Sequence, residues 1–299
     1  MRIGVDLGGT KIEAIALDES GAVLYRHRIA TPASNYDGIL DAIADLVLAI
    51  ERQLGQPGSV GAGTPGSLSP QTGLIRNSNS IALNGKPLDR DLSRVLQRPV
   101  RIENDANCFA LSEAIGGAAD GAESVFGVIL GTGVGGGLVI HGRVIPGRNR
   151  IAGEWGHNPM PWPRSNEWPG PACYCGKTGC IETFLSGPAL AKHFRAAAMR
   201  DLSAQDIAGA AEAQDAEAQA AIELYEDRLA RGLAHVINIF DPGTIVLGGG
   251  LSNIARIYEA LPRLIPRYIF SDVFETAIVP AVFGDSSGVR GAAMLWPAD

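Results

Sequence analysis

Short apolar runs divided by glycine turns open the chain. They predict strands over residues 2–7, 12–17 and 23–27, each bounded by turn-forming residues. Gly8 and Gly9 join the first two runs, and the sequence after the turn has a strand period and not a helical one. The chain is therefore expected to begin with an antiparallel hairpin sheet.

The clearest helical pattern of the first half comes next. Apolar residues recur three and four positions apart across residues 36–54, and Gly55 follows as a C-terminal cap. Farther along, the pattern predicts short strands over residues 60–63 and 100–102. A helix over residues 106–115 is expected to follow, with Asn104 or Asp105 as its N-cap.

The sequence of strand, glycine turn and strand returns in the second half. Residues 125–130 and 138–140 have strand character, and a glycine-rich turn over residues 131–137 lies between them. A small, polar connector over residues 116–124 precedes this repeat. We therefore predict two α/β domains, residues 1–117 and 118–284, with a C-terminal helix in residues 285–299 that packs back on the first domain.

The rest of the second half alternates between helices and strands after one irregular stretch. Residues 155–179 are rich in Pro, Gly and Trp and show no period, so they predict a loop that needs a staple of its own. The elements predicted after it are helices over residues 188–199, 216–240, 254–268 and 287–296, and strands over residues 244–247 and 278–282.

Composition limits the function classes. The 299 residues are 46% hydrophobic and carry a net charge of −7, which argues against binding to nucleic acid or to an anionic membrane surface. The chain shows neither a run of about 18 apolar residues nor a signal-like start. We expect a cytoplasmic protein with a packed core.

The first glycine turn has the composition of a phosphate site. A strand that ends in Asp6 and turns through Gly8 and Gly9 can present backbone N–H groups and the Thr10 hydroxyl to a phosphate, while Asp6 holds hydrated magnesium. The alternative is an ordinary glycine hairpin. The repeat of the pattern at Gly131-Thr132-Gly133 favours the phosphate site.

Two common nucleotide motifs are excluded. Residues 131–136 match the dinucleotide fingerprint in form, but that motif must open a helix, and here the chain continues into a predicted strand. The sequence also lacks a P-loop with its Gly-Lys-Ser/Thr ending. A further glycine turn, Gly248-Gly249-Gly250, follows a strand and would contact a nucleotide near its adenosine.

Asp105 follows a short strand and precedes a helix. A carboxylate at that point can stand in a cleft and accept a proton from a substrate hydroxyl, so Asp105 is the candidate general base. The alternative is that Asn104 and Asp105 only cap the helix.

Four residues have the composition of a closed metal site. His157, Cys173, Cys175 and Cys180 supply one imidazole and three thiols, and glycines in the short cysteine loop let it wrap one ion. A structural zinc is predicted, with reduced thiols as the alternative. Cys108, beside Ala and Phe on a predicted helix, is expected in the core.

Two glutamates lie beside these ligands. Glu154 precedes His157 and Glu182 follows Cys180, so the same loop would position both as acceptors for sugar hydroxyls, although glutamates more commonly lie at the surface. The tryptophans of this region either form loop core, the favoured interpretation, or flank the pocket: Trp155, Trp162 and Trp168.

Together these motifs resemble the ROK family of sugar kinases and related repressors. The resemblance spans essentially the whole chain. It is carried by the segments Asp6-Leu7-Gly8-Gly9-Thr10-Lys11, Asn104-Asp105-Ala106-Asn107, Gly131-Thr132-Gly133, Glu154-Trp155-Gly156-His157, Cys173-Tyr174-Cys175-Gly176-Lys177, Cys180-Ile181-Glu182-Thr183 and Val246-Leu247-Gly248-Gly249-Gly250.

The resemblance implies an α/β, actin-like (ribonuclease H-like) ATPase fold with two domains around a cleft. ATP with Mg²⁺ would bind at the glycine turns, and a sugar would bind against the zinc loop. The implied ATP-binding residues are Asp6, Gly8, Gly9, Thr10, Lys11, Gly131, Thr132, Gly133, Gly135, Gly248, Gly249 and Gly250.

The resemblance also implies the sugar site and a homodimer. Asp105 would take the proton, and His157 would use one ring nitrogen for zinc and turn its other edge toward the sugar. The implied sugar-binding residues are Gly66, Asn104, Asp105, Glu154, His157 and Glu182.

Within the family, three segments look most like bacterial fructokinases that also accept mannose: Asn77-Ser78-Asn79-Ser80, Asn158-Pro159 and residues 285–291. The predicted reaction is transfer of a phosphoryl group from MgATP to the 6-hydroxyl of fructose, giving fructose 6-phosphate. The alternative acceptors are glucose, N-acetylmannosamine and N-acetylglucosamine.

The sequence disfavours two other classes of function. A sugar-responsive repressor of the same family would carry an added DNA-binding module, for which the residues before Asp6 leave no room, and the acidic charge disfavours it. An ATPase of this fold that acts on protein partners is disfavoured by the sugar-loop residues.

Overall fold

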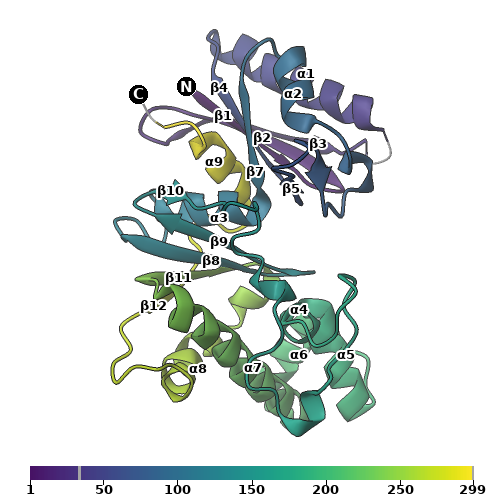
Figure 1. Ribbon diagram of the computed structural model, residues 1–299, viewed down its shortest axis with the longest axis vertical. Helices are drawn as coiled ribbons and strands as arrows, with labels where there is room; N and C mark the ends of the chain where they lie inside the picture. Colours follow the sequence, from purple (N-terminus) through teal and green to yellow (C-terminus); the bar gives the residue numbers. More distant parts are fainter. Residues whose placement is uncertain (33–34, 298–299) are drawn as a thin grey trace. The chain divides into compact units, whose positions relative to one another are not determined.

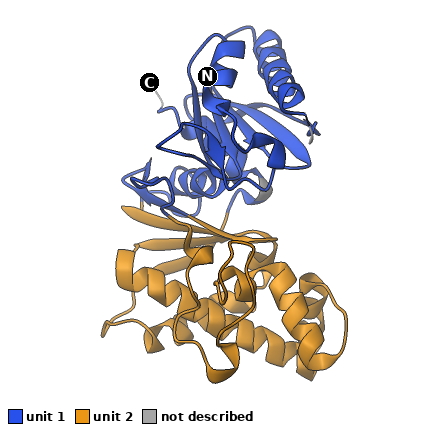
Figure 2. Cartoon of the chain, turned by 45° about the vertical axis from the view of Figure 1, so that its right-hand side comes forward, with its two compact units in different colours: residues 1–121, 137–152, 282–299 blue, residues 122–136, 153–281 orange. Residues whose placement is uncertain are grey.

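The computed structural model describes residues 1–32 and 35–297. The chain forms two compact units, which Figure 2 shows in different colours. Unit 1 contains residues 1–121, 137–152 and 282–299, of which 298–299 lie outside the described residues, and unit 2 contains residues 122–136 and 153–281. The sequence predicts residues 118–121, 137–152 and 282–284 in the second domain. They belong to unit 1, where Gly137 packs so closely that an added Cβ would lie 2.5 Å from the carbonyl oxygen of Ala106.

Unit 1 is built on a five-stranded sheet with the strand order β3-β2-β1-β4-β7 (Figure 1). The first three strands pair antiparallel, and β1, β4 and β7 run parallel. The strands are β1 (Arg2–Leu7), β2 (Lys11–Leu17), β3 (Val23–Ala30), β4 (Ser59–Thr64) and β7 (Val100–Asn104). The hairpin start predicted from the glycine turn is confirmed.

Helices cover the sheet of unit 1 on both faces. The elements outside the sheet are α1 (Tyr36–Leu54), β5 (Ser67–Leu68), β6 (Ile75–Arg76), η1 (Ile81–Leu83), α2 (Leu88–Val95), α3 (Asp105–Ala114), β10 (Arg143–Val144), η6 (Gly284–Ser286) and α9 (Ser287–Met294). In β1, Ile3, Val5 and Leu7 are buried with the apolar residues of α1 and α2. Alternate residues of a strand face opposite sides, so Gly4 and Asp6 face α9.

Glycines make the contact between the sheet and α9 possible. A Cβ on Gly4 would lie 2.0 Å from the carbonyl oxygen of Val289, and one on Gly61 of β4 would lie 2.0 Å from that of Ala292. Real Cβ atoms do not approach so closely, so any side chain there would push α9 away from the sheet.

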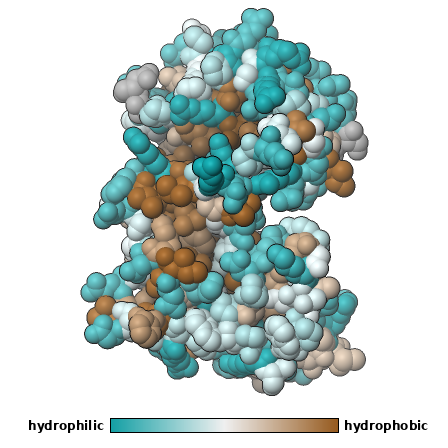
Figure 3. Space-filling model, viewed as in Figure 1, coloured by the Kyte–Doolittle hydropathy of each residue, from teal (hydrophilic) through white to brown (hydrophobic). Residues whose placement is uncertain are grey.

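The amphipathic helix predicted over residues 36–54 is confirmed with the same bounds. Asn35 caps its start by accepting a hydrogen bond from the N–H of Gly38, and Gly55 ends it in the left-handed conformation. Figure 3 shows mainly hydrophilic side chains over the part of unit 1 that carries α1 and α2, as expected for helices with one buried face.

Unit 2 combines a sheet with a long buried helix. The second sheet has the order β10-β9-β8-β11-β12, and the division between the units falls within β9. Its strands are β8 (Ser124–Leu130), β9 (Val134–Ile140), β11 (Thr244–Gly248) and β12 (Ala277–Pro280). The helices of unit 2 are η2 (Trp155–His157), η3 (Ser165–Glu167), α4 (Glu182–Leu185), α5 (Gly187–Ala198), α6 (Ala204–Glu212), α7 (Ala216–Phe240), η4 (Gly250–Asn253), α8 (Arg256–Leu264) and η5 (Ile265–Arg267).

Several predicted elements differ from the structure. The helix predicted over residues 254–268 starts at Arg256 as α8 and continues from Ile265 as the 3₁₀-helix η5, because Pro266 has no N–H to donate to the carbonyl oxygen four residues earlier. The strand predicted over residues 278–282 ends at Pro280. Helices α2 and α6 were not predicted.

Among the described residues, no helix is both long and apolar enough to cross a lipid bilayer.

The tryptophan interpretation was right for one residue and wrong for two. Trp155 is buried, and its Nε1 donates to the carbonyl oxygen of Gly135 at 3.0 Å. Trp162 is 49% exposed and stacks on Tyr268, while Trp168 is 73% exposed.

The irregular loop is attached to α7 by buried ion pairs. Glu167 is buried there between two arginines of α7, Arg228 at 2.8 Å and Arg231 at 2.8 Å.

Replacing Glu167 tests this attachment. Burial raises the pKa of Glu167, but hydrogen bonds from Arg231, the Arg164 backbone and Arg228 outweigh it and bring the pKa from 4.5 to about 2. The depressed value means that the stabilisation is fully present above about pH 4.5 and is lost as the pH falls toward 2. We expect Glu167→Gln to lower the free energy of unfolding at pH 7 by about 3 kcal/mol, since it leaves buried arginines without their counter-charge.

Urea unfolding at pH 7, 5 and 3 measures this effect. The deficit of Glu167→Gln relative to the unsubstituted chain should shrink at pH 3. The control is Glu217→Gln, whose carboxylate pairs with Arg200 at the surface at 3.1 Å and should leave the midpoint unchanged. Equal stability of both variants at pH 7 would show that the buried ion pairs do not hold the loop.

Candidate functional site

The predicted residues of unit 1 gather where its parallel strands end. Asp6, the penultimate residue of β1, pairs with Gly63 of β4, and Asn104 ends β7 beside Thr64 of β4. The carboxyl ends of parallel strands form the usual ligand-binding edge of an open α/β sheet. Topology thus brings Asp6, Gly66, Asn104 and Asp105 to one edge.

The first glycine turn lies beyond the end of β1 and is open to solvent. Gly9, Thr10 and Lys11 are exposed, and the turn is closed by a hydrogen bond of 3.0 Å from the N–H of Gly8 to the carbonyl oxygen of Lys11. An added Cβ on Gly8 would lie 2.9 Å from that same oxygen, so the tight turn needs glycine. This geometry leaves the turn accessible to a phosphate.

Asp6 stands in a space that two glycines leave open. Positions for a Cβ on Gly288 of α9 and on Gly63 lie 3.4 Å and 3.8 Å from its carboxylate oxygens. Burial and the nearby carboxylate of Asp105 raise the pKa of Asp6 to about 7. Two carboxylates that disfavour each other's charge form a site that a divalent cation would stabilise.

Asn104, and not Asp105, is the N-cap of α3. The side chain of Asn104 caps α3 by accepting from the N–H of Ala106 at 2.9 Å, and it donates to the carbonyl oxygen of Gly66 at 3.1 Å. Asp105 is the first residue of α3, where the helix dipole favours a negative charge. The N-cap reading is confirmed for Asn104, and Asp105 keeps its place as the candidate base.

Gly66 can only be glycine. Its φ is 80°, and a Cβ would lie 2.4 Å from the carbonyl oxygen of Arg76 and 2.8 Å from the nitrogen of Ser78. The structure therefore joins Gly66, Asn104 and the segment after β6 into one wall of the site.

Sequence reasoning missed Glu113 of α3, which is fully buried in unit 1. Its carboxylate accepts hydrogen bonds from the N–H groups of Ala118, Val282 and Phe283 at 3.0–3.1 Å and from the Ser287 hydroxyl at 2.7 Å. These contacts fix the start of α9, the helix whose Gly288 lies against Asp6. The only signal was an acidic residue on a helix with little amphipathic character, which does not reveal partners 170 positions away.

In unit 2, the second and third glycine turns come together. They follow β8 and β11, which are parallel neighbours with Gly248 opposite Ile129. Gly249 has a φ of 83°, and a Cβ there would lie 2.5 Å from the carbonyl oxygen of Leu130. The two glycine turns predicted from the sequence, Gly131-Thr132-Gly133 and Gly248-Gly249-Gly250, therefore form one surface.

Glu182 connects this surface to the predicted sugar loop. Its Oε2 accepts from the N–H of Val134 at 2.9 Å and would lie 2.7 Å from a Cβ on Gly133. Gly156 of η2 packs against the carbonyl oxygen of Val134, which a Cβ would meet at 2.1 Å. The turn, α4 and η2 are therefore locked together, while Glu154 just before η2 is exposed.

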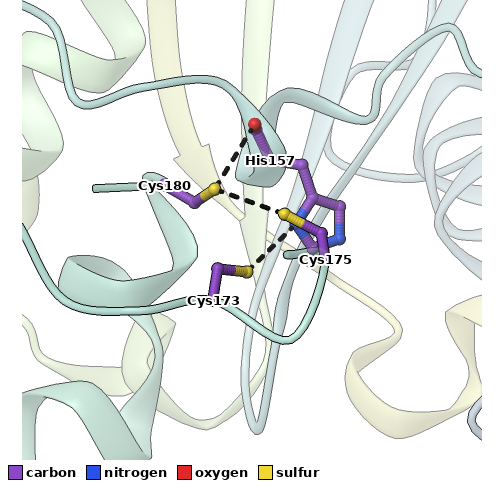
Figure 4. A group of neighbouring side chains, drawn as sticks. All are labelled: His157, Cys173, Cys175 and Cys180. Carbon is purple, nitrogen blue, oxygen red and sulfur yellow. Dashed lines mark hydrogen bonds between the residues drawn. The ribbon is translucent and has the colours of Figure 1, made fainter. Parts of the chain in front are cut away.

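The four predicted metal ligands converge (Figure 4). Backbone hydrogen bonds pair the chain around Asn158 with that around Cys180, and this pairing brings His157 to the cysteine loop. The Nδ1 of His157 lies 3.6 Å from Sγ of Cys173, and the Sγ atoms of Cys175 and Cys180 are 3.6 Å apart. All four ligand atoms lie within 4.8 Å of one another. Ligands of a tetrahedral zinc are separated by about 3.5–3.8 Å, so this donor set fits such an ion.

The second ring nitrogen of His157 has a partner of its own. Its Nε2 lies 3.0 Å from the hydroxyl of Tyr174, the residue between Cys173 and Cys175. Partial burial of Tyr174 raises the pKa of its hydroxyl, and the negative charge of Glu182 adds to this effect, so that the pKa is about 12. The predicted sugar residues of unit 2 and the ligand cluster therefore share one local environment.

The sequence profile of the ROK family matches residues 2–299. The chain belongs to the ROK family. Curated relatives include the N-acetyl-D-glucosamine kinases of Yersinia pseudotuberculosis serotype O:3 (strain YPIII), 40% identical over 303 residues, and of Escherichia coli O6:H1, 41% identical over 303 residues. Each comparison covers 100% of both chains.

Solved ROK structures share the fold. The ROK hexokinase from Thermus thermophilus superposes with a TM-score of 0.86 at 35% identity, covering 98% of this chain and 96% of that one. A ROK family glucokinase from Streptomyces griseus, in complex with glucose and AMPPNP, has a TM-score of 0.77 at 30% identity and covers 98% of both. The two-domain, actin-like ATPase fold predicted from the sequence is confirmed.

Proposed function

We propose that this ROK protein transfers the γ-phosphoryl group of MgATP to the primary 6-hydroxyl of a hexose. The observation that carries the proposal is the pair of carboxylates, Asp6 and Asp105, at the carboxyl ends of β1 and β7, close enough that Asp105 raises the pKa of Asp6. One carboxylate beside a phosphate turn and one at a helix start match the two needs of a sugar kinase, cation binding and proton removal.

The roles follow from these positions. Asp105 accepts the proton of the sugar's 6-hydroxyl. The oxygen of that hydroxyl forms a bond to the γ-phosphorus while the bond from this phosphorus to ADP breaks. Asp6 holds the hydrated magnesium that accompanies ATP, and the glycine turns 8–11, 131–135 and 248–250 bind the nucleotide through backbone N–H groups. Gly66, Asn104, Glu154, His157 and Glu182 bind the sugar.

The Cys and His cluster is proposed to hold a structural zinc. Its four donors leave no ligand position for substrate, so the ion would act by fixing the loop and not by activating an oxygen. His157, Cys173, Cys175 and Cys180 would thereby set the positions of Glu154 and Glu182 at either end of the cluster.

The acceptor sugar has two candidates. N-acetylglucosamine comes first because curated relatives that match the whole chain carry that name, and they support it over the fructose predicted from the sequence. Fructose remains the second candidate because residues 77–80, 158–159 and 285–291 resemble the corresponding segments of fructokinases.

A panel of sugars decides between them. ADP release coupled to a dye should be measured with N-acetylglucosamine, fructose, mannose, glucose and N-acetylmannosamine, and the preferred sugar should exceed the others in kcat/KM by about tenfold or more. We expect N-acetylglucosamine to lead. A lead for fructose would assign the second candidate, and ADP release that is independent of every sugar would contradict a hexose kinase.

Asp105→Ala tests the base. We expect kcat to fall by about 10³-fold while ATP binding and the unfolding midpoint stay the same, because only proton removal is lost. Asp41→Ala, an exposed carboxylate of α1, is the matched control and should retain full activity. Asp105→Ala with more than a tenth of the original kcat would overturn the assignment.

Cys175→Ser tests the zinc. Metal analysis should find about one zinc per unsubstituted chain and well under half of that in Cys175→Ser, with a raised KM for the sugar. Cys108→Ala removes a buried thiol outside the cluster and should keep its zinc. A fully active preparation free of metal would refute the structural role.

A further inference from the structure

A third carboxylate lies on the face of the unit 1 sheet that carries Asp6. Gly63 of β4 pairs with Asp6 of β1 on one side and with Glu103 of β7 on the other. Residues in register on neighbouring strands face the same side of a sheet, so Asp6 and Glu103 share one face with a glycine between them. Glu103 lies two residues before the proposed base, Asp105. Its charge therefore lies next to the proposed site.

The carboxylate of Glu103 is turned back onto its own chain. Its Oε1 accepts hydrogen bonds from the N–H of Asn104 at 2.9 Å and from Nδ2 of Asn107 at 3.1 Å, and its Oε2 lies 3.4 Å from Nη1 of Arg150. The side chain is 11% exposed. Both oxygens thus have partners within unit 1, so Glu103 is poorly suited to bind a cation or to take a proton from a sugar.

The first turn of α3 is held on both sides of Asp105. Glu103 fixes the N–H of the residue before it, Asn104, and the side chain of the residue two positions after it, Asn107. Asn104 in turn caps the N–H of Ala106, which also donates to Oδ1 of Asp105 at 2.8 Å. The direction of the Asp105 carboxylate therefore depends on the backbone of this turn, and the turn depends on Glu103.

Burial makes this arrangement rigid. Asn107 is 4% exposed, so water competes little for its hydrogen bond to Glu103. A group that takes a proton during phosphoryl transfer must be placed accurately, since a displacement of about 1 Å can cost about 100-fold in rate. Glu103 can therefore affect the reaction without touching a substrate.

We infer that Glu103 is a positioning residue for the proposed base: its hydrogen bonds to Asn104 and Asn107 fix the first turn of α3 and thereby aim the Asp105 carboxylate at the sugar hydroxyl. Glu103 contacts neither the sugar nor the nucleotide. This inference rests on the proposed sugar kinase function.

Glu103→Ala removes both hydrogen bonds to the turn. We expect kcat with the preferred sugar to fall about 30-fold, because the base is displaced. KM for ATP, and the sugar affinity measured by calorimetric titration without ATP, should stay within about twofold, since no substrate contact is lost.

The double variant Glu103→Ala with Asp105→Ala shows whether Glu103 acts through the base. If it does, removing Glu103 from a chain that already lacks the base has little left to change. We expect kcat of the double variant to stay within about twofold of that of Asp105→Ala alone.

Glu103→Gln tests the hydrogen bonds without the charge. The amide oxygen can still accept from Asn104 and Asn107, while the half-exposed pair with Arg150 is lost at little cost. We expect kcat to return to within about threefold of the unsubstituted value.

Glu51→Ala is the matched control in unit 1. Glu51 also accepts from a backbone N–H, that of Gly58 at 2.8 Å, and pairs with an arginine, Arg98, at 2.7 Å, with 13% of its side chain exposed. Its loss should lower the urea midpoint but leave kcat within about twofold, since it does not hold the turn at Asp105. Urea unfolding of every variant establishes that it folds.

The other outcomes contradict the inference. Full kcat in Glu103→Ala would show that the base needs no such support, and a double variant slower than Asp105→Ala by the same factor would show that Glu103 acts independently of the base. Lower sugar affinity at unchanged kcat would make Glu103 a sugar ligand. A Glu103→Gln variant as slow as Glu103→Ala would show that charge and not hydrogen bonding matters. The proposed function fails differently, because the unsubstituted chain itself would then release no ADP in response to any sugar.

Discussion

Close backbone packing at glycine is the constraint on which unit 1 depends. Gly4 of β1 and Gly61 of β4 let α9 lie against the sheet, and Gly291 of α9 meets α3 at Cys108, where a Cβ would be 1.7 Å from a carbonyl oxygen. No side chain fits at these contacts. Because α9 lies this close, its first turn reaches Asp6, and because α3 packs on α9, Asp105 is held near Asp6. The two carboxylates lie near each other because glycines at these contacts let the helices approach closely.

Unit 2 reaches a similar result by different means. Glycines again allow the turn after β8 to meet the turn after β11, but the loop between Trp155 and Cys180 contains only the short 3₁₀-helices η2 and η3. Buried charge and the ligand cluster replace packing there. Glu167 ties one part of the loop to α7, while His157 and three thiols converge at the other part, with Glu154 and Glu182 on either side of them in the sequence.

Local patterns predicted much of this architecture because their causes are local. The amphipathic period of residues 36–54 and the glycine turn after Asp6 are fixed by neighbours in the chain. The same holds for the cysteine spacing, since a loop of eight residues can hardly avoid bringing its thiols together. The change from α-helix to 3₁₀-helix at Ile265 also has a local cause, because Pro266 lacks the N–H that would continue the α-helical hydrogen bonds.

The sequence by itself determined most of the elements, the candidate ligand set and the family, since each depends on residue types at short separations or on motifs that recur together. Tertiary structure alone decided which of those residues meet. Asn104 caps α3 and contacts Gly66, Glu182 holds the turn at Val134, Glu113 anchors a segment 170 positions away, and Tyr174 faces His157. Such contacts depend on the order of strands in a sheet and on how closely helices approach it. The hydrophobic period of a single segment predicts neither the strand order nor the helix approach, so these contacts are seen only in the folded chain.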